Sequence, residues 1–260
     1  MTKVFEALER AKQGQGPVLT QTIGSKPETA VERTPRVRPW ALATPQTMPA
    51  PDRRLKETLA ALYQRIDTLL PEPGGKTVQF MGTRHGEGTS VIVREFAKIC
   101  AFNLGKTVVL LDANQREPSQ LRFFNIEPEH GWEECLRDTV PFENTVHQIG
   151  EQRLYVGQVS VHAAYAPRVF DLPQIGPFFE GLKRNFDLVL IDAPPAGASP
   201  DGFALSRRVD GVVVVVEAEK TRRQVAKRVL TSIEQLGGHV LGVILNKRRY
   251  PIPGFVYKWL

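Results

Sequence analysis

Short, continuous apolar runs alternate with helical patterns along most of this chain. The runs have the length of strands, as in residues 212–216, and lack the alternation of apolar and polar positions that a half-exposed strand would show. Strands that are apolar throughout are buried on both faces, as in parallel sheets covered by helices. We therefore expect an α/β fold with a parallel sheet flanked by helices on both faces, and ligands at the carboxyl ends of its strands.

The expected elements follow one another in a regular order. Hydrophobic periodicity and the positions of Gly and Pro predict helices over residues 55–70, 89–104, 132–137, 172–185, 201–208 and 222–236. Strands are expected over residues 77–82, 107–112, 154–157, 188–192, 211–216 and 240–245. Two of these strands end in a carboxylate and the first runs into a glycine-rich turn, so functional residues should gather at one edge of the sheet.

The N-terminal part of the chain differs in composition from the rest. Residues 1–13 have the pattern of an amphipathic helix, which is too short to be stable alone in water and would fold on a partner or a membrane surface. A frayed terminus is the alternative. Residues 14–54 are rich in Pro, Thr, Gln and Ala and predict a flexible linker, so the chain would carry a disordered N-terminal arm. Residues 55–260 would form the α/β domain.

The net charge of +6 is concentrated towards the two ends of the chain. Residues 1–55 carry nine Lys/Arg and five Asp/Glu, and residues 246–260 carry four Lys/Arg and no acid. Basic tails on a near-neutral body suit an acidic partner or an anionic membrane surface, and they argue against a core that grips nucleic acid. Solubilising tails are the alternative. The sequence has no apolar run of about 20 residues, no secretory signal and no CxxC pair of cysteines. We therefore expect a cytoplasmic protein.

A glycine-rich turn, GTRHGEGTS at residues 82–90, joins the strand expected over 77–82 to the helix that follows it. In this context successive backbone N–H groups and the positive end of the helix dipole form a cradle for phosphate. Gly86 and Gly88 allow close approach of the backbone, Glu87 lies between them, and the Ser90 hydroxyl can ligate Mg²⁺. A tight turn that no longer binds a nucleotide is the alternative.

Thr89 stands where the nucleotide-binding pattern GxxxxGK[ST] has a lysine, and Thr83 stands where it has its first glycine. That lysine neutralises phosphate charge during phosphoryl transfer. Without it, either another cation takes its place or the transfer activity is weak or absent. The candidate cations in the loop and near neighbouring strand ends are Arg84, His85, Lys106 and Arg116.

Two aspartates, Asp112 and Asp192, end expected strands at the edge where a nucleotide would bind. Magnesium is commonly held by one or two carboxylates together with phosphate oxygens. Asp192 could therefore hold Mg²⁺ through water, and Asp112 could act as a base or as a second metal contact. A helix cap or a turn-forming residue is the alternative for each.

Together these motifs resemble the cytoplasmic kinase modules of bacterial tyrosine kinases, which regulate capsule and exopolysaccharide assembly. The resemblance covers residues 55–260, and the opening MTKVFEALERA looks like the N-termini of stand-alone members. The segments LYQRIDTLLPE, GEGTS, SPDG and NKRRYPIPGFVYK look like a subgroup that lacks the P-loop lysine. The resemblance implies a P-loop kinase-like domain with ATP and Mg²⁺ as its cofactors.

The resemblance also implies roles for segments of the chain. Residues 82–90 correspond to the Walker A loop, with Ser90 as the Mg²⁺ ligand. Residues 109–116 correspond to the Walker A′ segment, with Asp112 as a base or metal-linked acid. Residues 189–192 correspond to Walker B and end in Asp192.

Further positions compare with the wider group of deviant-Walker ATPases. Asn246 resembles their adenine-contacting asparagine, and Arg84 stands at the position of their signature lysine. The chain also departs from the kinases, because Asn114 replaces the second acid of Walker A′ and the ExxRxxR oligomerisation motif is not visible within residues 55–70. Tyr250 and Tyr257, the candidate phosphorylation sites, replace a dense tyrosine cluster.

The function implied is a kinase-like, nucleotide-binding regulator of exopolysaccharide or capsule polymerisation and export. It would act with a chain-length-determining co-polymerase of the inner membrane, and would lie peripherally at that membrane through this partner. The resemblance leaves a homo-oligomer open and implies no nucleic acid. The alternatives are a non-catalytic adaptor of the same system and a deviant-Walker ATPase of the partition or division-site type (ParA- or MinD-like).

Overall fold

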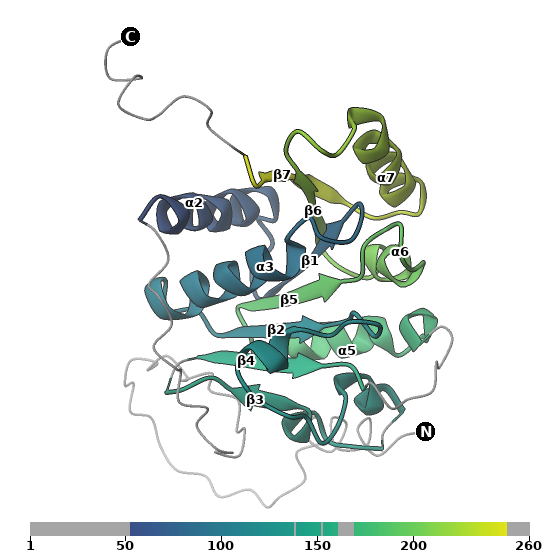
Figure 1. Ribbon diagram of the computed structural model, residues 1–260. Coiled ribbons are helices and arrows are strands. Elements are labelled where there is room, and N and C mark those ends of the chain that lie inside the picture. Colours follow the sequence, from purple (N-terminus) through teal and green to yellow (C-terminus); the bar gives the residue numbers. More distant parts are fainter. Residues whose placement is uncertain (1–52, 138, 152, 161–168, 249–260) are drawn as a thin grey trace, which may run out of the picture.

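The computed structural model of this chain describes residues 53–137, 139–151, 153–160 and 169–248. Across these residues, seven strands form one sheet in the order β3-β4-β2-β5-β1-β6-β7 (Figure 1). The strands are β1 (Lys76–Gly82), β2 (Val108–Asp112), β3 (Val146–Gln148), β4 (Leu154–Gln158), β5 (Leu188–Ala193), β6 (Gly211–Glu217) and β7 (Val240–Asn246). The helix predicted over residues 1–13, most of the predicted linker, Tyr250 and Tyr257 lie outside the described residues.

The predicted parallel sheet is confirmed from β4 to β7, where every neighbouring pair of strands is parallel. The edge strand β3 was not predicted and pairs with β4 in the antiparallel direction, with Val146 opposite Gly157. A strand of three residues is too short to show a periodicity. The sheet is therefore a mixed one with a single antiparallel edge within the described residues.

Helices cover both faces of the sheet, which explains why β2 and β5 are buried along their whole length (Figure 1). On one face Phe96 packs against Phe80, with 5.6 Å between their ring centroids. On the other face Phe179 packs with Ile191, and Ile233 belongs to a further cluster around β6. The covering helices are α2 (Arg53–Leu69) and α3 (Thr89–Lys98) on the first face, and α5 (Ile175–Leu182), α6 (Asp201–Ser206) and α7 (Arg223–Gln235) on the second.

Two of the predicted helices differ in form from the observed ones, and one further turn was not predicted. The chain continues beyond α3 as a π-helical turn, Ile99–Asn103. Trp132–Arg137 is a 3₁₀ helix, and a further 3₁₀ turn, Val169–Asp171, precedes α5. Apolar residues spaced by three and four positions fit each of these helix types, so the pattern could not distinguish them.

The helix α2 begins at Arg53, two residues before the predicted start of the domain. An ion pair of 2.9 Å between Arg53 and Glu57 joins the first two turns and favours this earlier start. Within the described residues, no helix combines the length and the apolar character needed to cross a membrane.

Candidate functional site

The glycine-rich turn joins β1 to α3, as predicted, and its conformation depends on two glycines. Gly86 and Gly88 have φ angles of 85° and 87°, in the left-handed region that glycine adopts most readily. Gly88 is the N-cap of α3, so the first N–H groups of that helix face the turn without partners inside the helix. A β-carbon on Gly82 would lie 2.8 Å from Thr89 Oγ1, which places the Thr89 hydroxyl against the end of β1.

The Glu87 side chain is fully buried and holds the turn closed. Its carboxylate accepts hydrogen bonds from the backbone N–H groups of Thr83 at 2.5 Å and Arg84 at 3.1 Å. It also accepts from the Thr83 hydroxyl at 2.8 Å and from the Thr221 hydroxyl, which lies after β6, at 2.5 Å. Glu87 therefore satisfies the amino-side N–H groups of the turn, and the N–H groups at the start of α3 remain for a phosphate.

Asp112 and Asp192 end up as neighbours, because they are partners in the register of β2 and β5. Their exposed fractions are 0% and 1%. The two oxygens of Asp112 accept backbone hydrogen bonds from Asn114 at 3.0 Å, Ser119 at 2.8 Å and Gln120 at 3.1 Å. Both aspartates thus lie at the carboxyl-end edge of the sheet, as predicted, and the register makes them neighbours.

Gln120 joins this pair to the phosphate turn, and the sequence analysis missed it. It begins the short helix α4 (Gln120–Phe123), and its Nε2 donates to Asp192 Oδ2 at 2.6 Å and to the Ser90 carbonyl at 3.0 Å. The Ser90 hydroxyl also hydrogen-bonds Asp192. Nothing in the spacing around Gln120 distinguishes it, since it reaches the site through the loop that follows β2.

Burial and the nearby charge of Asp192 raise the pKa of Asp112 well above the usual carboxyl range. Burial also raises the pKa of Asp192, although hydrogen bonds from Gln120 and Ser90 and the charge of Arg94 oppose this rise. The Arg94 guanidinium interacts electrostatically with both carboxyls, and its Nη1 donates to Gln120 Oε1 at 3.4 Å. The single positive charge of Arg94 does not neutralise both carboxyls when they are ionised. The pair therefore favours binding a proton or a cation.

The donor set of Ser90, Asp112 and Asp192 fits Mg²⁺ held jointly by the protein, phosphate oxygens and water. No group of three or more His, Cys, Asp or Glu side chains that could hold a metal occurs among the described residues. Magnesium keeps several waters and is bound through one or two carboxylates plus phosphate oxygens. Ser90 and Asp192, which already touch, are the residues that would hold it, with Asp112 beside them.

The predicted cations do not all reach the turn. Arg84 is half exposed, with its Nε 3.9 Å from Glu87 Oε1. Arg116 lies farther along the edge, where it lines a cavity of about 870 Å³ together with Arg122 and Gln158. Gln158 is the partner of Asp112 in the register of β4 and β2, but neither aspartate lines this cavity.

Asn246 lies at the end of β7 and contacts the turn. Its Nδ2 donates to the Glu87 carbonyl at 2.8 Å. A β-carbon on Gly88 would come within 2.4 Å of the same nitrogen, so the end of β7 packs directly on the glycine that caps α3. The structure therefore brings Asn246 to the predicted phosphate loop.

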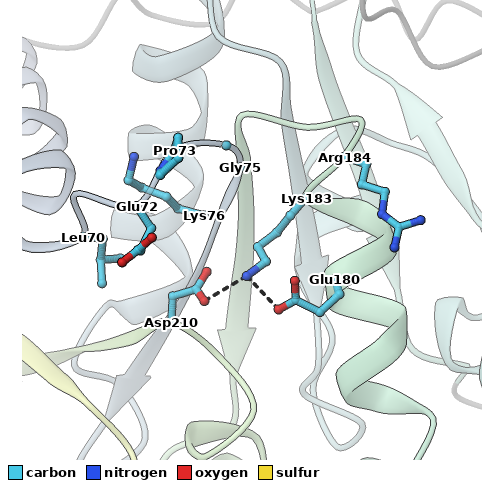
Figure 2. Close-up of a pocket in the computed structure, with 10 residues that line it drawn as sticks. Leu70, Glu72, Pro73, Gly75, Lys76, Glu180, Lys183, Arg184 and Asp210 are labelled. Atoms are coloured by element: carbon cyan, nitrogen blue, oxygen red, sulfur yellow. Dashed lines mark hydrogen bonds and ion pairs between the residues drawn. The ribbon is translucent and has the colours of Figure 1, made fainter.

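A second cavity, of about 630 Å³, lies at the opposite edge of the sheet, near the amino ends of β1 and β6 (Figure 2). Figure 2 shows Lys183 between two carboxylates, 2.7 Å from Glu180 and 3.0 Å from Asp210. Asp210 also accepts a hydrogen bond of 2.7 Å from the backbone of Thr77. These charges neutralise one another and fasten the strand ends, so we assign this cavity no functional role.

Several known proteins are similar to this chain in sequence. The tyrosine-protein kinase CpsD of Streptococcus agalactiae is 25% identical over 173 residues, which cover 66% of this chain and 75% of that protein. The succinoglycan biosynthesis transport protein ExoP of Rhizobium meliloti is 25% identical over 201 residues, which cover 76% of this chain and 25% of that protein. This chain thus spans most of one relative and only a quarter of the other.

Solved structures share the fold. The kinase domain of the Escherichia coli tyrosine kinase ETK superposes with a TM-score of 0.69 at 20% identity, over 76% of this chain and 79% of that domain. The family model described as cellulose biosynthesis protein BcsQ matches residues 76–236, which include the turn, both aspartates and Gln120. The chain therefore belongs to the BcsQ family of cellulose biosynthesis proteins.

Proposed function

We propose that this protein binds a nucleotide with Mg²⁺ and acts as a kinase-like regulator of exopolysaccharide or capsule polymerisation and export. Its relatives include a succinoglycan transport protein and tyrosine-protein kinases, and its family is named for cellulose biosynthesis. It would work on the cytoplasmic side of the inner membrane, docked on a chain-length-determining co-polymerase. The basic ends of the chain suit such a location.

The observation that carries this proposal is the link from Asp112 through Gln120 to Asp192 and Ser90. A tight βα turn that had lost its ligand would not need two buried carboxyls at neighbouring strand ends, because burying them without a cation costs stability. Magnesium would supply positive charge to the phosphates and to Asp192. The residues of the chain supply the other functions. The turn would orient the phosphate oxygens, and Asp112 would accept a proton.

The phosphate acceptor would be a tyrosine of this chain. Tyr250 and Tyr257 are the candidate acceptors within the chain, and Asp112 would take the proton of the attacking hydroxyl. Autophosphorylation would be read by mass spectrometry of the C-terminal peptide after incubation with ATP and Mg²⁺. Replacing both tyrosines by phenylalanine should abolish any such signal.

Calorimetric titration of the full chain with ATP and ADP, with and without Mg²⁺, tests nucleotide binding. We expect saturable binding that Mg²⁺ strengthens and that Asp192→Ala and Ser90→Ala weaken by about tenfold or more. Asp171→Asn is the matched control, because Asp171 forms an exposed ion pair with Arg207 away from the turn. Lack of binding by the unaltered chain at millimolar nucleotide would reject the proposal.

A non-catalytic adaptor of the same system is the second candidate. Two observations favour it: Thr89 provides a hydroxyl in place of an ammonium group, and Glu87 already occupies N–H groups of the turn. An adaptor should keep supporting polysaccharide production with Asp192→Ala and lose it when residues 1–13 are deleted. The partition-type ATPase predicts instead a dimer that forms only with ATP, which light scattering during the same titrations would detect.

A further inference from the structure

Lys247 follows the last residue of β7 and reaches the phosphate turn. Its Nζ donates a hydrogen bond of 2.5 Å to the carbonyl of Gly86. Its Cε would lie 3.8 Å from a β-carbon built on Gly88, so the side chain passes over the glycine that immediately precedes Thr89. The ammonium group therefore lies at the rim of the turn whose own lysine is missing.

The backbone of Lys247 is held in an unusual conformation that directs this side chain. Its φ angle of 57° lies in the left-handed region, which few residues other than glycine adopt. The side chain of Asn246 stabilises it, because Asn246 Oδ1 accepts a hydrogen bond of 2.8 Å from the Lys247 N–H. Asn246 Nδ2 meanwhile donates to the Glu87 carbonyl. Two successive residues of the β7 end thus contact two successive carbonyls of the turn.

The other cations around the turn are placed differently. Lys220 Nζ pairs with Glu217 Oε1 at 2.6 Å, whereas Lys247 Nζ is 3.7 Å from the other oxygen of Glu217. Arg84 lies beside the carboxylate of Glu87 at 3.9 Å. Lys247 combines a direct contact with the turn and a side chain that is 46% exposed, so its torsions can change without disturbing the core.

From these contacts we infer that Lys247 supplies the phosphate-binding charge that Thr89 lacks. This inference rests on the proposed nucleotide binding and names the residue that makes such binding feasible without the P-loop lysine. Without nucleotide, the ammonium group is held by the Gly86 carbonyl and lies near Glu217. When phosphates occupy the turn, the ammonium group exchanges the neutral carbonyl for a phosphate oxygen, which is a stronger, charge-assisted partner.

The test titrates Mg²⁺·ATP into the full chain carrying Lys247→Met, which keeps an unbranched side chain of similar size and removes the charge. We expect the affinity for Mg²⁺·ATP to fall by about tenfold or more, and to stay within about threefold of the unaltered chain in Lys247→Arg. Lys220→Met is the matched control, because it removes a neighbouring lysine that pairs with Glu217. Its affinity should change by less than about threefold.

A second variant separates a charge effect from a structural one. Thr89→Lys restores the ordinary lysine position, so it should recover most of the affinity lost in Lys247→Met and add little to the unaltered chain. The thermal unfolding midpoint without nucleotide should be the same in Lys247→Met and Lys220→Met. If affinity is lost only together with a lowered midpoint, the residue is structural and the inference is wrong.

The outcomes distinguish this inference from the proposed function. If the unaltered chain binds Mg²⁺·ATP and Lys247→Met binds equally well, nucleotide binding stands and the role of Lys247 is rejected. If the unaltered chain does not bind, both are rejected. If Lys247→Met binds weakly and Thr89→Lys does not rescue it, the ammonium group does not replace the P-loop lysine and the inference is likewise overturned.

Discussion

Asp112 and Asp192 occupy paired positions on β2 and β5, and both carboxyls are buried beside one guanidinium, that of Arg94. The pair stores unfavourable electrostatic energy whenever both members are ionised, because the surrounding core cannot solvate two negative charges. A cation or a proton relieves it.

The first prediction concerns stability and pH. Both aspartates have pKa values raised by burial, so the native state holds protons that the unfolded chain has already lost above the ordinary carboxyl pKa. The free energy of unfolding should therefore fall as the pH rises from about 4 through these raised values. Asp192→Asn removes one charge and should raise the free energy of unfolding at pH 8 by about 1–3 kcal/mol, with a smaller gain at pH 5. Urea unfolding at both pH values measures this, with Asp171→Asn as a control that should leave the difference unchanged.

The second prediction concerns protons released on binding. A site that holds a proton in place of a cation must give it up when Mg²⁺ and nucleotide bind. Titrations in two buffers of different ionisation enthalpy should therefore reveal proton release, and the affinity for Mg²⁺·ATP should rise with pH through the raised pKa of Asp112. Chelation of Mg²⁺ by EDTA should abolish the release. Equal apparent enthalpies in both buffers would contradict this account of the pair.

The third prediction concerns Gln120. Gln120→Glu places a third carboxyl within hydrogen-bonding distance of Asp192, where the amide now lies at 2.6 Å. It should lower the free energy of unfolding by about 2–4 kcal/mol at pH 8 and by less at pH 5. Gln120→Met removes the hydrogen bonds without adding charge and should cost about 1–3 kcal/mol, with a weaker pH dependence. Equal pH dependence in the two variants would show that charge repulsion is not the cause.

The fourth prediction compares two glycines of the turn. Gly86 and Gly88 have nearly the same positive φ, so an alanine at either position incurs similar backbone strain. A β-carbon at Gly86 meets nothing within 4 Å, whereas one at Gly88 lies 2.4 Å from Asn246 Nδ2. Gly88→Ala should therefore lower the free energy of unfolding by about 1–3 kcal/mol more than Gly86→Ala. Thermal unfolding of the two variants side by side measures the difference, and similar midpoints would mean that β7 can move away from the turn at little cost.

The sequence predicted the parts of the site that lie on regular elements. Asp112 and Asp192 end continuous apolar strands, and the register of a parallel sheet then brings them together. The turn was recognisable because a strand, glycines and a helix occur in that order. Each of these features is contained in one short, continuous segment of the sequence. It can therefore be recognised without knowledge of the fold.

The residues that complete the site could not be predicted, because their positions depend on contacts between distant segments. Gln120 reaches Asp192 from a helix of four residues, and Arg94 occupies a buried position on a helix whose polar residues would ordinarily face water. Lys247 points at the turn only because its backbone is left-handed beyond β7. Neither β3 nor these placements has a periodic signature.

The contacts of β7 with the turn also set an order of events during synthesis. Asn246 and Lys247 bind carbonyls that precede them by 159 and 161 positions in the chain, and β7 is the outermost strand beside β6. A ribosome delivers segments in sequence order, so the glycine-rich turn leaves the exit tunnel long before the two residues that contact it. A nascent chain paused before residue 246 would carry the turn without these contacts. Under the proposed function, a chain would therefore become able to bind nucleotide only after β7 has left the ribosome, so binding would follow completion of the sheet.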